Sequence, residues 1–123
     1  MFELKVVSFF SAAHSLREYK GKCEAVHGHN WKIEVIVERK DLNSQGLAID
    51  FTDLKALLKE VLDQMDHKDL NQIDFFAKQN PSSERIAYFI YTKLKKPVED
   101  RGCKLKKVLA WEQRDSCAGY SQE

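Results

Sequence analysis

The chain has 123 residues, the usual size of one domain, so we expect a single domain over residues 1–123. Hydrophobic residues make up 43% of it and charged residues 32%, a balance that indicates a folded globular protein rather than a disordered tail. Twenty Lys and Arg against nineteen Asp and Glu leave a formal charge of +1. Because so small a charge cannot hold a polyanion such as DNA, nucleic acid is not expected as a partner.

Membrane insertion and secretion are not expected either. The longest nearly apolar run, residues 6–13, is far shorter than the roughly twenty residues of a membrane helix. Glu3 and Lys5 interrupt the N-terminus, and no apolar stretch with a small-residue cleavage site follows them. A cytoplasmic protein is therefore predicted, with free thiols at Cys23, Cys103 and Cys117.

Two strands are predicted in the first third of the chain. Residues 2–14 place apolar side chains on one parity, and a single serine breaks this alternation of a half-buried strand. Residues 27–38 repeat the pattern. We expect the two strands to pair antiparallel, with His14, His27 and His29 on their apolar sides.

Two helices are predicted next. Asp50 or Thr52 can cap the first, and the second is expected to begin with Pro81 at its first helical position, to run to Lys95 and to be closed by Pro97. The apolar positions of the first helix follow a period of 3.6 residues: Leu54, Leu57, Leu58, Val61, Leu62 and Met65.

Residues 105–114 and 118–122 indicate a third and a fourth strand. The order ββααββ favours an α+β fold in which a four-stranded antiparallel sheet carries two helices on one face. The strands bear apolar residues on both parities, among them Trp31 and Ile36, so the second sheet face needs cover. Self-association into a homo-oligomer is therefore expected.

Three of the four histidines are predicted to lie together. On a strand, His27 and His29 project to the same side about 6.6 Å apart along the chain, and Gly28 leaves room for close approach. His14 on the paired strand supplies a third nitrogen. Three histidines with a vacant fourth position are a common catalytic zinc arrangement.

Two other interpretations of these histidines remain open. They could be ordinary polar side chains at a strand end, or ligands of a closed structural site in which Cys23 is the fourth ligand. Cys23 lies four residues before His27, in a loop where Lys20, Lys22 and a nearby metal ion would favour the thiolate. In an open site this thiolate could act as a base or a nucleophile.

Two further candidates contain a carboxylate: an Asp-His pair and a single glutamate. Asp66 and His67 directly follow the first helix, where an aspartate can orient a histidine and raise its basicity, although such neighbours also occur by chance on surfaces. Glu112 shares the parity of Val108 and Ala110, so it is predicted to be a part-buried carboxylate that either anchors a ligand or is simply exposed.

Six motifs occur in order over essentially the whole chain, and together they resemble one known family. They span residues 10–14, 23–30, 49–51, 65–71, 80–84 and 111–112. They resemble the 6-pyruvoyl-tetrahydropterin synthase family, most closely its bacterial 6-carboxy-tetrahydropterin synthase branch. The resemblance implies a T-fold, with trimers that close into a β-barrel, stack as hexamers and carry their sites at subunit interfaces.

The resemblance also implies a reaction. The substrate would be 7,8-dihydroneopterin triphosphate. The product of the bacterial branch would be 6-carboxy-5,6,7,8-tetrahydropterin, with acetaldehyde and triphosphate released, on the route to 7-deazaguanines such as queuosine. Two alternatives are kept: a 6-pyruvoyl-tetrahydropterin synthase that only eliminates triphosphate, and a non-catalytic zinc- or pterin-binding module.

Residue roles follow from the same resemblance. Cys23 would be the catalytic base, and Asp66 with His67 the proton relay contributed by an adjacent subunit. Glu112 would anchor the pterin ring. Ser82 and Ser83 are expected to contact the pterin, although Thr-Ser is commoner at that place in the family. The implied zinc ligands are His14, His27 and His29.

Overall fold

The computed structural model describes residues 1–18 and 25–122. A long hairpin forms its first part: β1 (Phe2–His14) and β2 (His27–Arg39) pair antiparallel along their whole lengths. Phe2 lies opposite Arg39 at one end and His14 opposite His27 at the other. Both predicted strands and their antiparallel pairing are therefore confirmed.

The predicted alternation of the hairpin is confirmed as well. Val6 and Phe10 of β1 and Trp31, Ile33 and Val35 of β2 are all buried, and their apolar side chains form the sheet side of the core. The parity that buries them also carries the three strand histidines toward the same face.

The first helix, α1 (Phe51–Leu62), begins as predicted. The Asp50 carboxylate accepts a hydrogen bond from the backbone N–H of Thr52 at 2.8 Å, which satisfies one of the free donors of the first turn. Leu54, Leu58 and Val61 are buried against the sheet.

The second helix, α2 (Ser83–Asp100), differs from its prediction at both ends. Its cap is Ser82, whose Oγ accepts from the N–H of Arg85 at 3.2 Å, so Pro81 lies before the helix rather than at its first position. The helix also continues through Pro97 to Asp100. Burial of Val98 explains this continuation, because its packing offsets the one backbone hydrogen bond that a proline near a helix end removes.

The sheet has five strands rather than four. After α2 the chain forms β4 (Lys104–Gln113) and β5 (Ser116–Tyr120), the latter starting two residues earlier than predicted. The additional strand, β3 (Lys68–Asp69), pairs parallel with β1, so the sheet is mixed, in the order β3-β1-β2-β4-β5. Two residues are too few to show a periodicity, which is why the sequence pattern missed β3.

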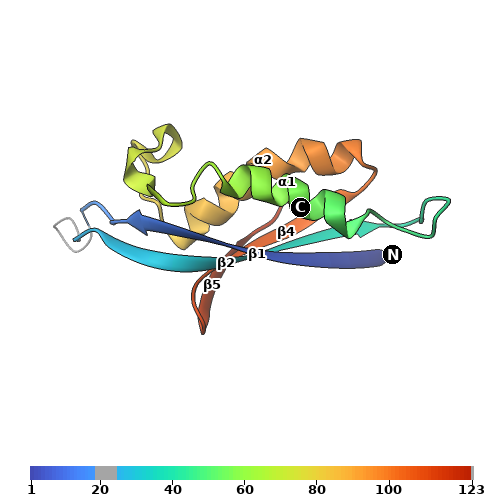
Figure 1. Cartoon of the computed structure of the whole chain (residues 1–123), viewed down its shortest axis with the longest axis horizontal. Coiled ribbons are helices and arrows are strands. Elements are labelled where there is room, and N and C mark those ends of the chain that lie inside the picture. The colour runs from blue at the N-terminus through green and yellow to red at the C-terminus, as the bar shows by residue number, and fades with distance from the viewer. Residues whose placement is uncertain (19–24, 123) are drawn as a thin grey trace.

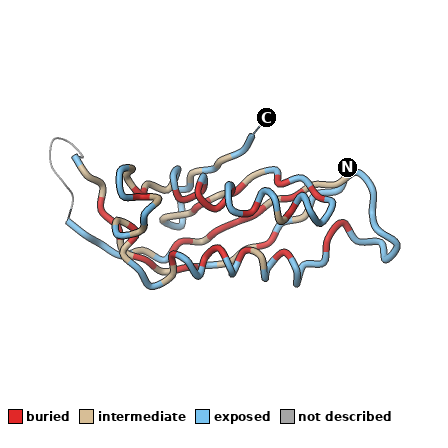
Figure 2. The backbone as a smooth tube through the Cα atoms, turned by 90° about the horizontal axis from the view of Figure 1, so that it is seen from above, coloured by how far each residue is buried: buried red, intermediate tan, exposed pale blue. Residues whose placement is uncertain are grey.

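The layers confirm the predicted α+β class. Figure 1 shows α1 and α2 on one face of the sheet, and in Figure 2 buried positions recur along both helices and the strands next to them. The other sheet face bears Phe9 with 65% of its surface exposed, so an apolar side chain there is uncovered within one chain. No helix among residues 1–18 and 25–122 is both long and apolar enough to cross a membrane.

Candidate metal centre and its surroundings

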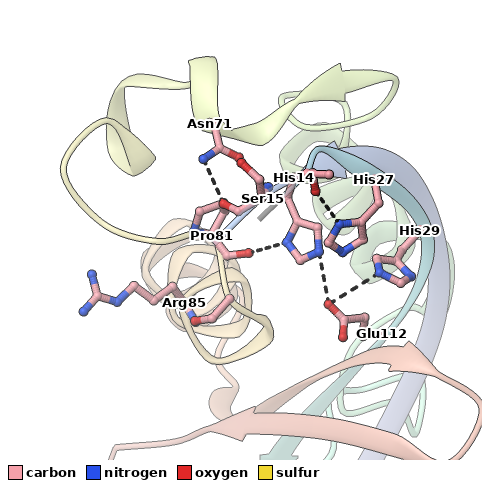
Figure 3. A network of polar contacts seen from close by, with 10 residues as sticks. His14, Ser15, His27, His29, Asn71, Pro81, Arg85 and Glu112 are labelled. Carbon is pink, nitrogen blue, oxygen red and sulfur yellow. Dashed lines mark hydrogen bonds and ion pairs between the residues drawn. The ribbon is translucent and has the colours of Figure 1, made fainter. Parts of the chain in front are cut away.

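Three imidazoles meet where the β1–β2 hairpin ends. His14 closes β1 directly opposite His27, the first residue of β2, and His29 lies two residues further along β2, opposite Ala12. Ring centroids are 4.6 Å apart for His14 and His27, 5.3 Å for His14 and His29, and 4.9 Å for His27 and His29. One nitrogen from each ring lies within 4.8 Å of the other two, so a single ion could contact all three (Figure 3).

Backbone carbonyls fix the orientation of two of these rings. His14 Nδ1 lies 2.8 Å from the carbonyl oxygen of Pro81, and His27 Nδ1 lies 3.0 Å from that of Ala25. Because a carbonyl can only accept, each Nδ1 must carry the hydrogen. The lone pairs are then on the Nε2 atoms, which are free to bind a metal.

Glu112 completes the cluster from β4. The β4–β5 pairing passes from Trp111 opposite Cys117 to Gln113 opposite Ser116, so Glu112 is the extra residue of a β-bulge. Its Oε1 lies 3.2 Å from His14 Nε2 and 3.8 Å from His29 Nε2. The prediction of a part-buried carboxylate is confirmed, since its side chain is 32% exposed.

The contact between His14 and Glu112 shows that the residues fit a cation. His14 Nε2 is buried and has no hydrogen-bond partner. Its lone pair faces a carboxylate oxygen, and two such acceptors attract only when a proton or a metal ion lies between them. Three imidazole nitrogens are a donor set that suits zinc and other divalent transition metals.

Two asparagines hold the chain that follows β1. The side-chain amide of Asn71 accepts from the N–H of Ser15 and donates to the carbonyl of Ser15, at 2.9 Å each. Asn80 makes the same pair of bonds with Arg17, at 2.7 and 3.1 Å. The sequence pattern gave these asparagines no positioning role, because their partners lie more than fifty positions away along the chain.

Asp66 and His67 lie at another place, on the outer edge of β1. Asp66 Oδ1 accepts from the N–H of Ser11 at 2.9 Å, and Asp66 Oδ2 lies 3.1 Å from His67 Nδ1. His67 has a φ of 59° and donates its own N–H to the carbonyl of Ser11. The predicted pairing of Asp66 with His67 is therefore present in the structure.

A cavity of about 610 Å³ lies beside His67. Ser11, Ala13, Gly28 and Asn30 line it and, by strand alternation, face away from the imidazoles, but Ala12 and His29 line it as well. His67 and His29, one member of the imidazole cluster, therefore border the same cavity.

The remaining candidates occupy different environments. Ser82 caps α2 and Ser83 is the first residue of that helix. Cys103 is buried and donates to the carbonyl of Ala48, and burial raises the pKa of its thiol. Cys117 is exposed, and the prediction that Cys103 and Cys117 are free thiols is confirmed. Cys23 lies outside the residues that the structure describes.

The fold and the imidazole cluster define a small α+β protein with a candidate metal centre at the end of a β-hairpin. Comparison with known proteins identifies the family. A family model described as 6-pyruvoyl tetrahydropterin synthase matches residues 3–123. The chain belongs to this family.

Individual relatives agree with this assignment. The 6-carboxy-5,6,7,8-tetrahydropterin synthase of Haemophilus influenzae is 31% identical, over 99% of this chain and 100% of that protein. A dihydroneopterin monophosphate aldolase of Pyrococcus furiosus is 34% identical, over 84% of this chain and 82% of that protein. The structure of 6-pyruvoyl tetrahydropterin synthase from Caenorhabditis elegans superposes with a TM-score of 0.85 at 26% identity and covers 99% of this chain and 96% of that one.

Removal of one imidazole tests the metal centre. His14→Ala should weaken the binding of added zinc by at least about a hundredfold, because it deletes a buried donor nitrogen. Metal content after dialysis, measured by atomic emission, gives the answer. The matched control, His67→Ala, removes an imidazole that is not part of the cluster and should retain the metal. Equal metal content in both variants would contradict the assignment.

Asp66 gives the protein a pH-dependent contribution to stability. The Ser11 N–H, followed by His67, lowers the pKa of Asp66, so folding favours the ionised carboxylate. This stabilisation is present above the unfolded-state pKa near 4 and is lost as the pH falls through the lower folded-state pKa. Asp66→Ala should therefore lower the Tm at pH 7. The difference in Tm between this variant and the unmodified protein should become smaller as the pH falls.

Thermal unfolding followed by circular dichroism between pH 7 and pH 2 measures this gap. Glu60→Ala serves as the control, because Glu60 is an exposed acidic residue of α1. A gap for Asp66→Ala that stays constant over the whole range would show that the carboxylate charge plays no part.

Proposed function

We propose that the chain is a zinc-dependent lyase that converts 7,8-dihydroneopterin triphosphate to 6-carboxy-5,6,7,8-tetrahydropterin and releases acetaldehyde and triphosphate. One observation carries the proposal: three imidazoles and a carboxylate converge in a chain whose full-length relative in Haemophilus influenzae is named for this product. We further propose that this reaction belongs to the 7-deazaguanine route to queuosine and that the protein acts in the cytoplasm.

His14, His27 and His29 would hold the zinc through their Nε2 atoms. The carbonyls of Pro81 and Ala25 keep two of these rings in the tautomer that leaves Nε2 available. A bound zinc supplies Lewis acidity toward hydroxyl oxygens of the substrate side chain, which makes the adjacent C–H bonds more acidic. The role of the protein residues is then to orient the substrate and to move protons.

Cys23 is proposed as the base that takes a proton from the substrate. It precedes His27 by four residues, so the chain cannot carry it farther than about 14 Å from that ligand along the backbone. A thiolate suits the role because a cationic surrounding can bring its pKa close to neutrality, where a base works best.

Asp66 and His67 are proposed to act in the site of a neighbouring copy. Within one chain they are hydrogen-bonded to Ser11 at the outer edge of β1, and His67 borders an open cavity that a substrate held by a second chain could enter. The uncovered sheet face that bears Phe9 supports assembly, and a trimer or hexamer with interfacial sites is proposed.

Glu112 is proposed to bind the pterin. A carboxylate can accept two N–H bonds from the guanidine-like edge of the ring, which selects against rings that lack these donors. The bulge in β4 holds it beside the imidazoles, so ring recognition and proton transfer would involve neighbouring but separate groups. Ser82 and Ser83 are proposed as further pterin contacts, since they follow directly on Pro81, the partner of His14.

Product analysis tests the proposal most simply. Incubation with 7,8-dihydroneopterin triphosphate should release acetaldehyde together with triphosphate. Triphosphate without acetaldehyde would instead indicate a 6-pyruvoyl-tetrahydropterin synthase. Turnover of dihydroneopterin monophosphate alone would favour the activity named for the Pyrococcus furiosus relative. Absence of any turnover by zinc-loaded protein would favour a binding module.

Replacement of the proposed base separates an open site from a closed one. Cys23→Ala should lower kcat by about 10²–10⁴-fold while zinc content stays unchanged, because general-base catalysis contributes about that factor. Cys117→Ala, which removes an exposed thiol, is the matched control and should remain active. Loss of zinc from Cys23→Ala would contradict the proposed role and indicate that Cys23 is a metal ligand.

A further inference from the structure

A second cavity, of about 710 Å³, lies beyond the imidazole cluster. Two separate parts of the chain line it: the residues that follow β1, and the segment that leads into α2 together with the first turn of that helix. Three of the lining residues are cationic: Arg17, Lys78 and Arg85. None of these three is used by the proposed reaction.

The cations of this cavity form no ion pair within the described part of the chain. Within residues 1–18 and 25–122, no carboxylate oxygen lies within 4.0 Å of a charged nitrogen of Arg17, Lys78 or Arg85, whereas most ion pairs of the two helices join lysines to acids four positions away. One acid, Glu18, also lines the cavity. The described lining therefore carries an excess of positive charge in a concave surface, which attracts an anion.

The two arginines are held in place by neutral groups. Arg17 donates from Nη1 to the backbone carbonyl of Gln79 at 3.1 Å and from Nη2 to that of Asn71 at 3.2 Å. Arg85 Nη1 donates to the side-chain oxygen of Gln79 at 2.7 Å. Gln79 thus orients both guanidinium groups, and each keeps N–H donors for a further acceptor.

The neutral oxygens that hold the two arginines favour the binding of an anion. They restrict the arginines without cancelling their charge, so less side-chain entropy is lost when an anion binds. Guanidinium groups match the oxygens of phosphate in pairs, and a lysine adds a point charge. Ser82 also lines the cavity and caps α2, so the positive end of an 18-residue helix adjoins it.

The cavity is close to the candidate metal centre but separate from it. Pro81 lies between them: its carbonyl contacts His14, while Asn80 and Ser82 on either side of it line the cavity. Figure 3 shows Arg85 on the opposite side of Pro81 from the imidazoles.

We propose that this cavity binds a polyphosphate group through Arg17, Lys78 and Arg85. Three cations around one cavity suit several linked phosphates better than a single carboxylate. Two sources could provide the group: the triphosphate of a bound substrate, which would rest on the function proposed above, or free triphosphate, which would not.

Inorganic triphosphate is the direct probe. Calorimetric titration of the zinc-loaded full chain should detect binding, and Arg85→Gln and Lys78→Gln should each weaken it about tenfold, as expected for loss of one charge-assisted hydrogen bond. Both side chains are exposed, so these variants should fold. Lys96→Gln, which removes the same charge at the other end of α2, should bind like the unmodified protein.

A variant that removes a negative charge from the cavity tests the proposal in the opposite direction. Glu18→Gln removes the acid of the described lining and should tighten the binding of triphosphate. No binding by the unmodified protein, or equal affinities for Arg85→Gln and Lys96→Gln, would overturn the proposal whatever the enzyme activity turns out to be.

Kinetics then distinguish the two sources. If the substrate tail occupies the cavity, Arg85→Gln should raise KM for 7,8-dihydroneopterin triphosphate with little change in kcat. If free triphosphate is the ligand, KM should stay unchanged while the calorimetric loss persists. Either result supports the site, and the first also supports the proposed substrate.

Discussion

The antiparallel register of β1 and β2 is the constraint on which the rest of the structure depends. Because side chains alternate between sheet faces, a slip of one residue would turn His14 away from His27 and His29 and would expose the apolar face of β1. Phe10 stacked on Trp31, with centroids 5.3 Å apart, resists such a slip. The pair that buries the core therefore also assembles the imidazole cluster.

The segment before α2 connects the core to both candidate sites. Burial of α2 against the sheet fixes the position of Pro81, whose carbonyl sets the tautomer of His14. The same segment supplies Gln79 and Asn80, which hold Arg17 of the second cavity. In the sequence these residues indicate only the start of a helix. In the structure they form hydrogen bonds with residues at and just after the end of β1, more than sixty positions away.

Local sequence patterns predicted much of this fold. The incorrect end of α2 and the missed strand β3 each have a physical cause. Alternation over residues 2–14 and the helical period after Asp50 were strong signals, because each reflects one buried face. The helix boundary at Pro97 depended on the burial of Val98, which propensity rules do not include. The two residues of β3 depend on contacts with β1.

The site could be predicted only as far as residue types on neighbouring strands allow. The grouping of three histidines followed from strand parity and pairing. The carbonyls that orient them, the approach of Glu112 and the two asparagine bridges depend on parts of the chain far apart in sequence. Such contacts leave no periodic pattern, so sequence reasoning assigned chemistry to the residues but not their supporting groups.

The central claim is that the three imidazoles bind a metal ion and leave a coordination position for substrate. X-ray absorption at the zinc edge of the loaded resting protein tests it most directly. We expect nitrogen or oxygen neighbours alone, at about 2.0–2.1 Å. A sulfur neighbour at about 2.3 Å would contradict the account, because a thiolate on the ion would close the site and could not serve as the base.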